Sequence, residues 1–306
     1  MTATPAEPTV RVGPEVAPGG RLLGIGLTLG SMVAGQGGAA LAVLLFPRVG
    51  AEGVVTLRLI LASAMLLAIS RPGLRGRTRR DWLLVALFAV VLTAMNSLFY
   101  QSIARIPLAA AVTVEVLGPL ALSVLIARRA VNWLCALLAA AGVVLLGRSG
   151  FGHLDPVGVA FALGAAVMWA SYIVLSSRVG RRFAGTQGLA LAMAGAAVLS
   201  LPLGIARGGA GLLVPQTVGL AVGVAALSSA LPYALEMLAL RRIPTALFAV
   251  MMSLLPALSA AVGLVVLGQA VTALDSVAIG LVVVASGAAA RLSAVPARRT
   301  PVPIEP

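Results

Sequence analysis

The sequence contains few charged residues, few aromatic residues and no lysine, and it has one cysteine and one histidine. Charged residues make up 10% of the 306 positions, whereas a typical soluble domain is about one quarter charged. This shortage argues against a soluble globular fold. Cys135 is the only cysteine and His153 the only histidine, so the chain has too few of these residues for a disulfide framework or a His/Cys metal site. We therefore predict neither a metal nor a cofactor.

The charge that is present is strongly basic, with a formal net charge of +13. Such an excess can indicate a nucleic-acid partner when basic side chains form a patch on a soluble fold. Here all 22 basic residues are arginines, and nearly all of them fall between long apolar runs. This distribution excludes nucleic acid as the partner and indicates a lipid bilayer instead.

Long apolar runs dominate the chain, which is 60% hydrophobic. A membrane-spanning helix needs about 20 apolar residues, and lipid admits only helices or closed barrels because unpaired backbone groups find no water there. The runs are near-continuous rather than alternating, which favours helices. We predict an all-α polytopic membrane protein with ten transmembrane helices, at residues 22–46, 53–70, 82–102, 107–127, 130–147, 156–177, 186–205, 215–238, 244–267 and 274–292.

The arginines between these runs predict how the chain is oriented in the membrane. With the N-terminus inside, 17 of the 22 arginines fall in cytoplasmic segments, 4 fall in outer segments, and Arg58 lies within a predicted helix. This asymmetry follows the positive-inside rule. We therefore expect both termini to lie in the cytoplasm.

Two segments of the chain repeat at an offset of 137 residues. The tripeptide Arg-Ile-Pro ends at Pro107 before the fourth predicted helix and at Pro244 before the ninth, and Pro119 and Pro256 match at the same offset. Because each half holds an odd number of helices, the second copy enters the membrane from the opposite side, which is typical of secondary transporters. We divide the chain into a cytoplasmic tail (1–21), a first five-helix repeat (22–147), a second, inverted five-helix repeat (156–292) and a second cytoplasmic tail (293–306).

Three residues, Arg58, Glu115 and Glu236, are the candidates for a charge deep within the membrane. A charge at such depth costs roughly 2.5–3.5 kcal/mol on insertion scales and is rare without a role. Arg58 and Glu115 are predicted at comparable depth, so they form either a structural ion pair or a pair that binds a zwitterion, with Arg58 facing its carboxylate and Glu115 its amine. Glu236 either extends to the cytoplasmic interface, pairs with Arg241 or Arg242, or lines a cavity.

The same carboxylates are the candidates for coupling transport to protons. A coupling group must be titratable and reachable from each side of the membrane in turn, and His153 is misplaced because it falls in a predicted outer loop. We predict that Glu115, the deeper residue, carries the proton, and that Glu236 contributes to the substrate path on the inner side.

Polar side chains also follow single faces of several predicted helices. Asn96 and Tyr100 share a face of the third helix, and Trp169 and Tyr172 share a face of the sixth. Such stripes either make helix–helix hydrogen bonds or contact a ligand. Together they predict an outer cluster on the third and fourth helices and an inner cluster on the sixth and eighth. The predicted substrate path comprises Gln36, Asn96, Tyr100, Trp169, Tyr172, Ser229 and Tyr233.

Pro119, Pro232 and Pro256 are predicted helix breaks. A proline within a helix lacks the N–H that would bond the carbonyl four residues earlier. Interrupted helices at corresponding positions of two repeats indicate a transport site, and harmless kinks are the alternative.

Several short motifs accompany these features: Gln36-Gly37-Gly38-Ala39, Thr56-Leu57-Arg58-Leu59, Ser97-Leu98-Phe99-Tyr100, Glu115-Val116-Leu117-Gly118-Pro119-Leu120-Ala121, Ala230-Leu231-Pro232-Tyr233-Ala234-Leu235-Glu236-Met237 and Arg242-Ile243-Pro244. With them, the chain from residue 22 to residue 292 resembles the EamA-type members of the drug/metabolite transporter superfamily. More narrowly, it resembles the bacterial threonine and homoserine exporter subgroup.

The resemblance implies export of small amino acids across the bacterial inner membrane, driven by proton antiport. Two positions depart from the family pattern, which has a lysine in place of Val43 and a glutamate in place of Leu255. An EamA-type exporter of another metabolite or of a drug is therefore the alternative. We do not predict an enzyme, since an intramembrane enzyme would need a histidine or serine constellation at depth. A receptor or scaffold would not need an inverted repeat.

Overall fold

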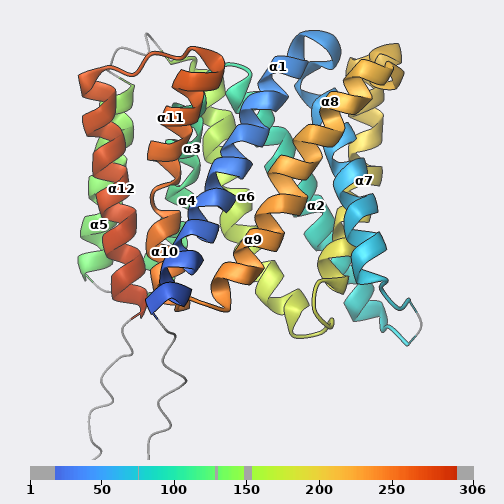
Figure 1. Cartoon of the computed structure of the whole chain (residues 1–306), viewed down its shortest axis with the longest axis horizontal. Coiled ribbons are helices and arrows are strands. Elements are labelled where there is room, and N and C mark those ends of the chain that lie inside the picture. Colours follow the sequence, from blue (N-terminus) through green and yellow to red (C-terminus); the bar gives the residue numbers. More distant parts are fainter. Residues whose placement is uncertain (1–17, 75, 128–129, 148–153, 295–306) are drawn as a thin grey trace, which may run out of the picture.

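The computed structural model describes residues 18–74, 76–127, 130–147 and 154–294, which form a bundle of helices (Figure 1). No strand occurs among these described residues. The elements are α1 (Pro18–Ser70), α2 (Arg79–Ile103), α3 (Leu108–Glu115), α4 (Leu117–Ala127), α5 (Ala130–Leu146), α6 (Pro156–Gly180), α7 (Gln187–Gly208), the 3₁₀ helix η1 (Gly209–Leu213), α8 (Pro215–Ala225), the π-helix η2 (Ala226–Ala230), α9 (Leu231–Leu240), α10 (Thr245–Met252), α11 (Leu255–Leu267) and α12 (Ala273–Ala294).

Seven helical segments of the described chain are long and apolar enough to cross a membrane, and two shorter apolar helices accompany them. The first segment, Gly20–Ser70, has 51 residues, and a straight helix of that length would extend about 75 Å. It reverses direction instead, because Gly50 adopts φ 68° and ψ 170°, a backbone conformation that favours glycine. Figure 1 shows the two limbs of α1, with the second limb descending beside α7. The limbs correspond to the predicted helices at 22–46 and 53–70.

Two further helices are interrupted at positions related by the sequence repeat. The first interruption separates α3 from α4 at Val116, and the second separates α10 from α11 at Ser253 and Leu254. Pro119 and Pro256 each lie four residues after the last residue of the preceding short helix. Because proline has no N–H, neither can continue the hydrogen-bond pattern of that helix, which accounts for the break.

Helix packing depends on small residues where two backbones approach closely. A Cβ atom added at Gly118 would overlap the carbonyl oxygen of Ala166, so α4 and α6 touch backbone to backbone there. A Cβ at Gly38 would lie 2.8 Å from the backbone nitrogen of Ser228, which brings α1 against η2. Other glycines of α1 are less confined: a Cβ at Gly30 would make an ordinary contact of 3.6 Å with the side chain of Leu235, and Gly26 has open space around it.

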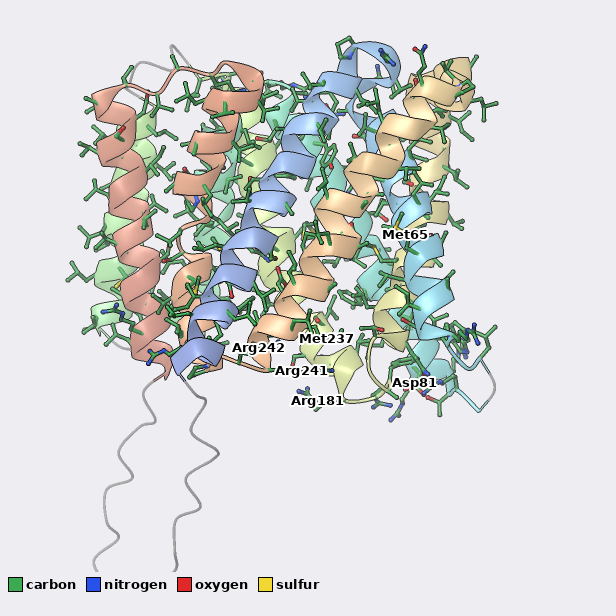
Figure 2. All side chains as sticks on the ribbon, viewed as in Figure 1. Met65, Asp81, Arg181, Met237, Arg241 and Arg242 are labelled. Atoms are coloured by element: carbon green, nitrogen blue, oxygen red, sulfur yellow. The ribbon has the colours of Figure 1, made fainter. Side chains whose placement is uncertain are left out.

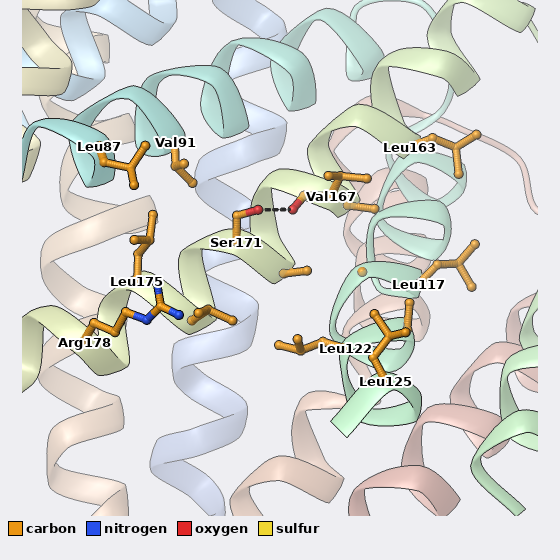
Figure 3. A pocket seen from close by; sticks show the side chains of 15 residues that line it. Leu87, Val91, Leu117, Leu122, Leu125, Leu163, Val167, Ser171, Leu175 and Arg178 are labelled. Atoms are coloured by element: carbon orange, nitrogen blue, oxygen red, sulfur yellow. Dashed lines mark hydrogen bonds between the residues drawn. The ribbon is translucent and has the colours of Figure 1, made fainter. Parts of the chain in front are cut away.

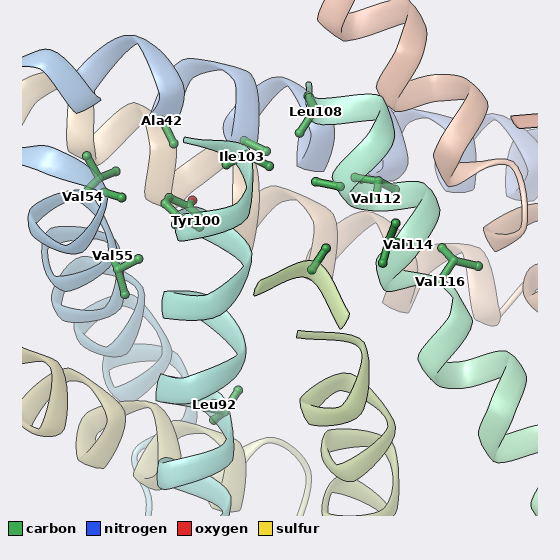
Figure 4. Close-up of a cluster of buried hydrophobic side chains, with 14 of the residues drawn as sticks. Ala42, Val54, Val55, Leu92, Tyr100, Ile103, Leu108, Val112, Val114 and Val116 are labelled. Carbon is green, nitrogen blue, oxygen red and sulfur yellow. The ribbon is translucent and has the colours of Figure 1, made fainter. Parts of the chain in front are cut away.

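Buried apolar side chains fill the space between α1, α2 and α3 (Figure 4). Many large apolar side chains face outward, including Leu83, Leu125 and Val265, as expected of helices that contact lipid rather than water. Charged residues gather at the ends of the bundle. Figure 2 shows Asp81, Arg181, Arg241 and Arg242 at the end where α1 begins and α12 finishes.

Gly118→Ala should destabilise the protein by about 1–3 kcal/mol, since a methyl group forced against the α6 backbone overpacks the contact. The matched control is Gly219→Ala in α8, where an added Cβ meets nothing within 4 Å and should stabilise the helix by roughly 0.5–1 kcal/mol. Thermal unfolding of the purified protein in detergent measures both. Equal changes in the unfolding temperature of the two variants would show that α4 and α6 do not pack as described.

Candidate functional site

A cavity of about 230 Å³ lies among helices that are far apart in the sequence. It is smaller than the roughly 300–1,000 Å³ typical of sites for drug-sized ligands. Its lining includes Gln36, Arg58, Asn96, Tyr100, Glu115 and Trp169, six of the residues predicted for transport. The remaining lining residues are Gly35, Ala39, Met95, Phe99, Val112, Ser228 and Leu255.

Arg58 anchors one wall of this cavity. One terminal nitrogen, Nη1, donates to Oδ1 of Asn96 at 2.6 Å and to the hydroxyl of Tyr100 at 3.3 Å. The other, Nη2, donates to the backbone carbonyl of Ser228 at 3.3 Å. The guanidinium carbon also lies 5.5 Å from the centre of the Tyr100 ring, within range of a cation–π contact. Arg58 therefore joins the second limb of α1 to α2 and η2.

The carbonyl of Ser228 is available to Arg58 because of the proline that follows it. Pro232 lies four residues later and has no N–H to donate, so the usual helical hydrogen bond to Ser228 cannot form. The chain adopts a π-helix over Ala226–Ala230 directly before this proline. π-Helical turns of this kind are frequent at functional sites.

Glu115 is the last residue of α3 and lies on the cavity wall. Within the described part of the chain it makes neither a hydrogen bond nor an ion pair shorter than 4.0 Å, although Arg58 interacts with it electrostatically. Arg58 and Glu115 thus face the same cavity without closing on each other. The structural ion pair offered as one interpretation does not form in this structure.

Two polar atoms of the cavity residues have no protein partner among the described residues. They are Oε1 of Gln36, an acceptor, and Nε of Arg58, a donor. The hydroxyl oxygen of Ser229, next to Ser228 in η2, is also buried without a partner. Buried polar groups are normally hydrogen-bonded, so these atoms are candidates for contacts with a ligand or with water.

Glu236 lies outside the cavity and accepts a hydrogen bond of 2.8 Å from the hydroxyl of Ser31 on the first limb of α1. No ion pair joins Glu236 to Arg241 or Arg242 in the described structure, and Arg242 donates instead to the carbonyl of Leu238. The pairing offered as one interpretation of Glu236 is therefore not observed, and its partner comes from another helix.

The structure also differs from the predicted division into outer and inner clusters. Trp169, assigned to the inner cluster, lines the same cavity as Asn96 and Tyr100 from the outer cluster. Tyr172 packs against the ring of Phe88, with ring centres 5.4 Å apart. The side chain of Tyr233 lies outside the described residues.

Sequence reasoning missed Glu52, which is 5% exposed and accepts hydrogen bonds from Ser97 at 2.9 Å and Gln101 at 2.8 Å. Gln101 in turn accepts from Arg105, and Arg105 lies 3.9 Å from Asp155 at the start of α6. The predicted helices at 22–46 and 53–70 leave Glu52 in the connection between them. The available signal is an acidic residue within a short connection between two long apolar runs.

The described residues contain no group of three or more His, Cys, Asp or Glu side chains that could hold a metal ion. His153, predicted in an outer loop, lies outside the described residues. Chemistry at the cavity therefore rests on the charged and polar side chains already named.

Comparison with known proteins relates the chain to transporters. Residues 156–289 match the model of the EamA-like transporter family. The threonine/homoserine exporter RhtA of Escherichia coli (strain K12) is 40% identical over 266 residues, covering 86% of this chain and 90% of that protein. The protein of the same name from Salmonella typhimurium (strain SL1344) is 39% identical over 253 residues, covering 82% of this chain and 85% of that protein. A solved crystal structure with 21% identity aligns with a TM-score of 0.61, over 90% of this chain and 96% of that one, and this likeness concerns the fold alone.

Pro232→Ala tests the contact between Arg58 and η2. Replacing a proline within a helix normally stabilises the helix, by up to about 3 kcal/mol. Here the restored N–H competes for the carbonyl of Ser228, so Arg58 loses an acceptor at a cost of about 1–3 kcal/mol. The control is Pro202→Ala inside α7, which carries no such penalty. Thermal unfolding should show a clearly smaller gain in stability for Pro232→Ala than for Pro202→Ala. Equal gains in stability would contradict the hydrogen bond between Arg58 and the carbonyl of Ser228.

Proposed function

The chain belongs to the EamA-like transporter family, and we propose that it is a secondary active exporter of small amino acids of the threonine and homoserine type. Membership of the family confirms the resemblance drawn from the motifs and makes the chain a multi-pass membrane transporter rather than an enzyme. The substrate class rests on the names of its relatives, which are threonine/homoserine exporters.

The proposed architecture is ten transmembrane helices in two inverted five-helix repeats. The reversal at Gly50 supports counting Gly20–Ser70 as two spans. Ala130–Leu146 adds another, and α10 with α11 forms an interrupted one. These additions bring the seven candidate spans to ten.

Reciprocal contacts support the inverted repeat. A Cβ at Gly158 would lie 2.7 Å from a methyl carbon of Ile106, and a Cβ at Gly24 would lie 2.6 Å from the same atom of Ile243. Ile106 and Ile243 are the middle residues of the two Arg-Ile-Pro turns. Each turn therefore packs on a glycine from the other half of the chain, as two halves related by a pseudo-two-fold axis would do.

The proposed orientation places both termini in the cytoplasm and the protein in the bacterial inner membrane. The start of α1 and the end of α12 lie at the same end of the bundle (Figure 1). That end also carries Arg181, Arg241 and Arg242, in keeping with the positive-inside rule.

Reporter fusions test this orientation. A fusion after Arg80, between the second and third proposed spans, and another after Arg299 should both report the cytoplasm, and a fusion near His153 should report the outside. The expectation follows from the arginine asymmetry. An external C-terminus would contradict the ten-span proposal.

The observation that carries the substrate proposal is the cavity that holds both Arg58 and Glu115. An amino acid is a zwitterion, so its carboxylate can accept from Arg58 and its ammonium group can donate to Glu115. Gln36 and Tyr100 add polar groups suited to a substrate hydroxyl. The small cavity favours an amino acid over a drug-sized ligand.

A second candidate is export of another metabolite by the same fold. Leu255 lines the cavity at the position where the threonine exporter subgroup is expected to have a glutamate, and it makes that part of the wall apolar. Uptake of labelled threonine into inverted membrane vesicles, with and without an imposed proton gradient, separates the candidates. Absence of gradient-driven threonine uptake by correctly inserted protein would favour the second.

Proton antiport with alternating access is the proposed mechanism. Glu115 faces the cavity and makes no hydrogen bond within the described chain, so it is open to a proton or a substrate ammonium group but not to both together. Competition of this kind couples export of the substrate to entry of the proton, since binding of the substrate ammonium group to Glu115 displaces the proton from it. Glu236 is proposed to act on the inner side, where it holds α9 to α1 through Ser31.

Glu115→Gln and Glu236→Gln in proteoliposomes separate these roles. A neutral Gln at the coupling site should preserve exchange of labelled for unlabelled threonine but abolish accumulation driven by a pH gradient. We expect that result for Glu115→Gln, whereas Glu236→Gln should still accumulate substrate. If both variants pump uphill in response to the gradient, neither carboxylate couples transport.

A further inference from the structure

An apolar groove runs along the outside of the bundle between α2, α4 and α6, apart from the transport cavity (Figure 3). Its volume is about 660 Å³, and its walls include Leu87, Leu125 and Val167, all strongly exposed. Such a groove on a membrane-facing surface is large enough to take an extended hydrocarbon chain.

One end of the groove carries positive charge. Arg178 is a lining residue at that end, and it also lines a neighbouring pocket of about 320 Å³ with Arg80, Arg181, Arg182 and Leu84. The two pockets therefore share Arg178 and meet there. The apolar groove thus ends at a cluster of four guanidinium groups, those of Arg80, Arg178, Arg181 and Arg182.

Most of this charge is not neutralised by the described protein. Arg182 forms an ion pair of 3.0 Å with Asp81, and Arg181 donates to the hydroxyl of Ser177. Arg80 and Arg178 make no hydrogen bond or ion pair within the described residues. Among the described residues, three of the four guanidinium groups thus have no carboxylate partner, and each of the three has several N–H donors without an acceptor.

We propose that the groove and the arginine cluster together form a binding site for an anionic phospholipid. The acyl chain would lie between α4 and α6, and the phosphate would accept hydrogen bonds from Arg80 and Arg178. Basic pockets between membrane helices on the cytoplasmic side suit anionic headgroups, and arginine matches phosphate geometry well. A second copy of this chain is a poorer occupant. If two copies met through this surface, their identical arginine clusters would repel each other, whereas the phosphate of a lipid is attracted to the cluster.

The site goes beyond the proposed transport function and does not depend on the substrate. Gly118 of α4 and Ala166 of α6 line the groove where the two backbones touch, so a lipid in the groove would lie against the α4–α6 contact. A lipid there would help to hold α4, the part of the interrupted helix that follows Glu115, against α6.

Native mass spectrometry of the purified chain tests the proposal, using an equimolar mixture of phosphatidylglycerol and phosphatidylcholine with matched acyl chains. The parent protein should retain phosphatidylglycerol preferentially. Each arginine near a membrane surface contributes about 1 kcal/mol, which is about fivefold in affinity, so Arg80→Gln/Arg178→Gln should weaken retention about 25-fold. Arg80→Lys/Arg178→Lys, which keeps the charge, should retain most of the preference.

Two controls separate lipid from other occupants. Arg241→Gln/Arg242→Gln removes the same charge from the same end of the bundle, away from the groove, and should leave retention unchanged. Ala121→Trp, which fills the groove and leaves every arginine, should also lose phosphatidylglycerol. Equal retention of both lipids by the parent protein, or equal losses in the two arginine-to-glutamine pairs, would overturn the site. Retention unchanged by Ala121→Trp would show headgroup or free phosphate binding alone and would overturn it too.

Discussion

Arg58 places a permanent positive charge inside the helix bundle, and the surrounding structure depends on providing acceptors for it. A guanidinium carries five N–H donors and stays protonated, so leaving it unpaired within a membrane is costly. The side chains of Asn96 and Tyr100 and the carbonyl of Ser228 supply acceptors from α2 and η2. These bonds hold three elements around the cavity. The Nε atom keeps no partner among the described residues, so the charge that joins the helices is also available to an anionic group of a ligand.

Backbone interruptions and small residues make this arrangement possible. Pro232 withdraws an N–H and thereby leaves the carbonyl of Ser228 for Arg58. Gly38 lets α1 approach η2 closely enough to bring that carbonyl beside the cavity. Pro119 similarly ends α3 near Glu115, which places a carboxylate at a helix end rather than along a continuous hydrogen-bonded cylinder. The same sequence features that weaken regular helices therefore concentrate polar groups in one small volume.

Much of the fold could be predicted because lipid restricts the backbone structures that a long apolar segment can adopt. Every predicted span coincides with one or more helices, since long apolar runs have no other way to satisfy their backbone groups in a membrane. The sequence left alternatives open where a partner comes from another helix. Arg58 bonds Asn96 and makes no ion pair with Glu115 in the described structure, and Glu236 bonds Ser31, which is 205 residues away in the sequence. Glu52 was missed because α1 reverses at Gly50, which buries a residue that an ordinary loop would expose.

The sequence by itself determined the helical class, the approximate spans, the repeated Arg-Ile-Pro and proline positions, and the identity of the charged residues within the apolar runs. These follow from local composition and spacing, because hydrophobic length and proline chemistry act over a few turns of helix. Only the tertiary structure decided which polar groups meet, that Trp169 shares a cavity with Asn96, and that an apolar groove ends at an arginine cluster. A helix can rotate about its axis without changing its own hydrogen bonds. Which face of it meets a neighbour therefore depends on side-chain packing against residues far along the chain, and no local pattern contains that information.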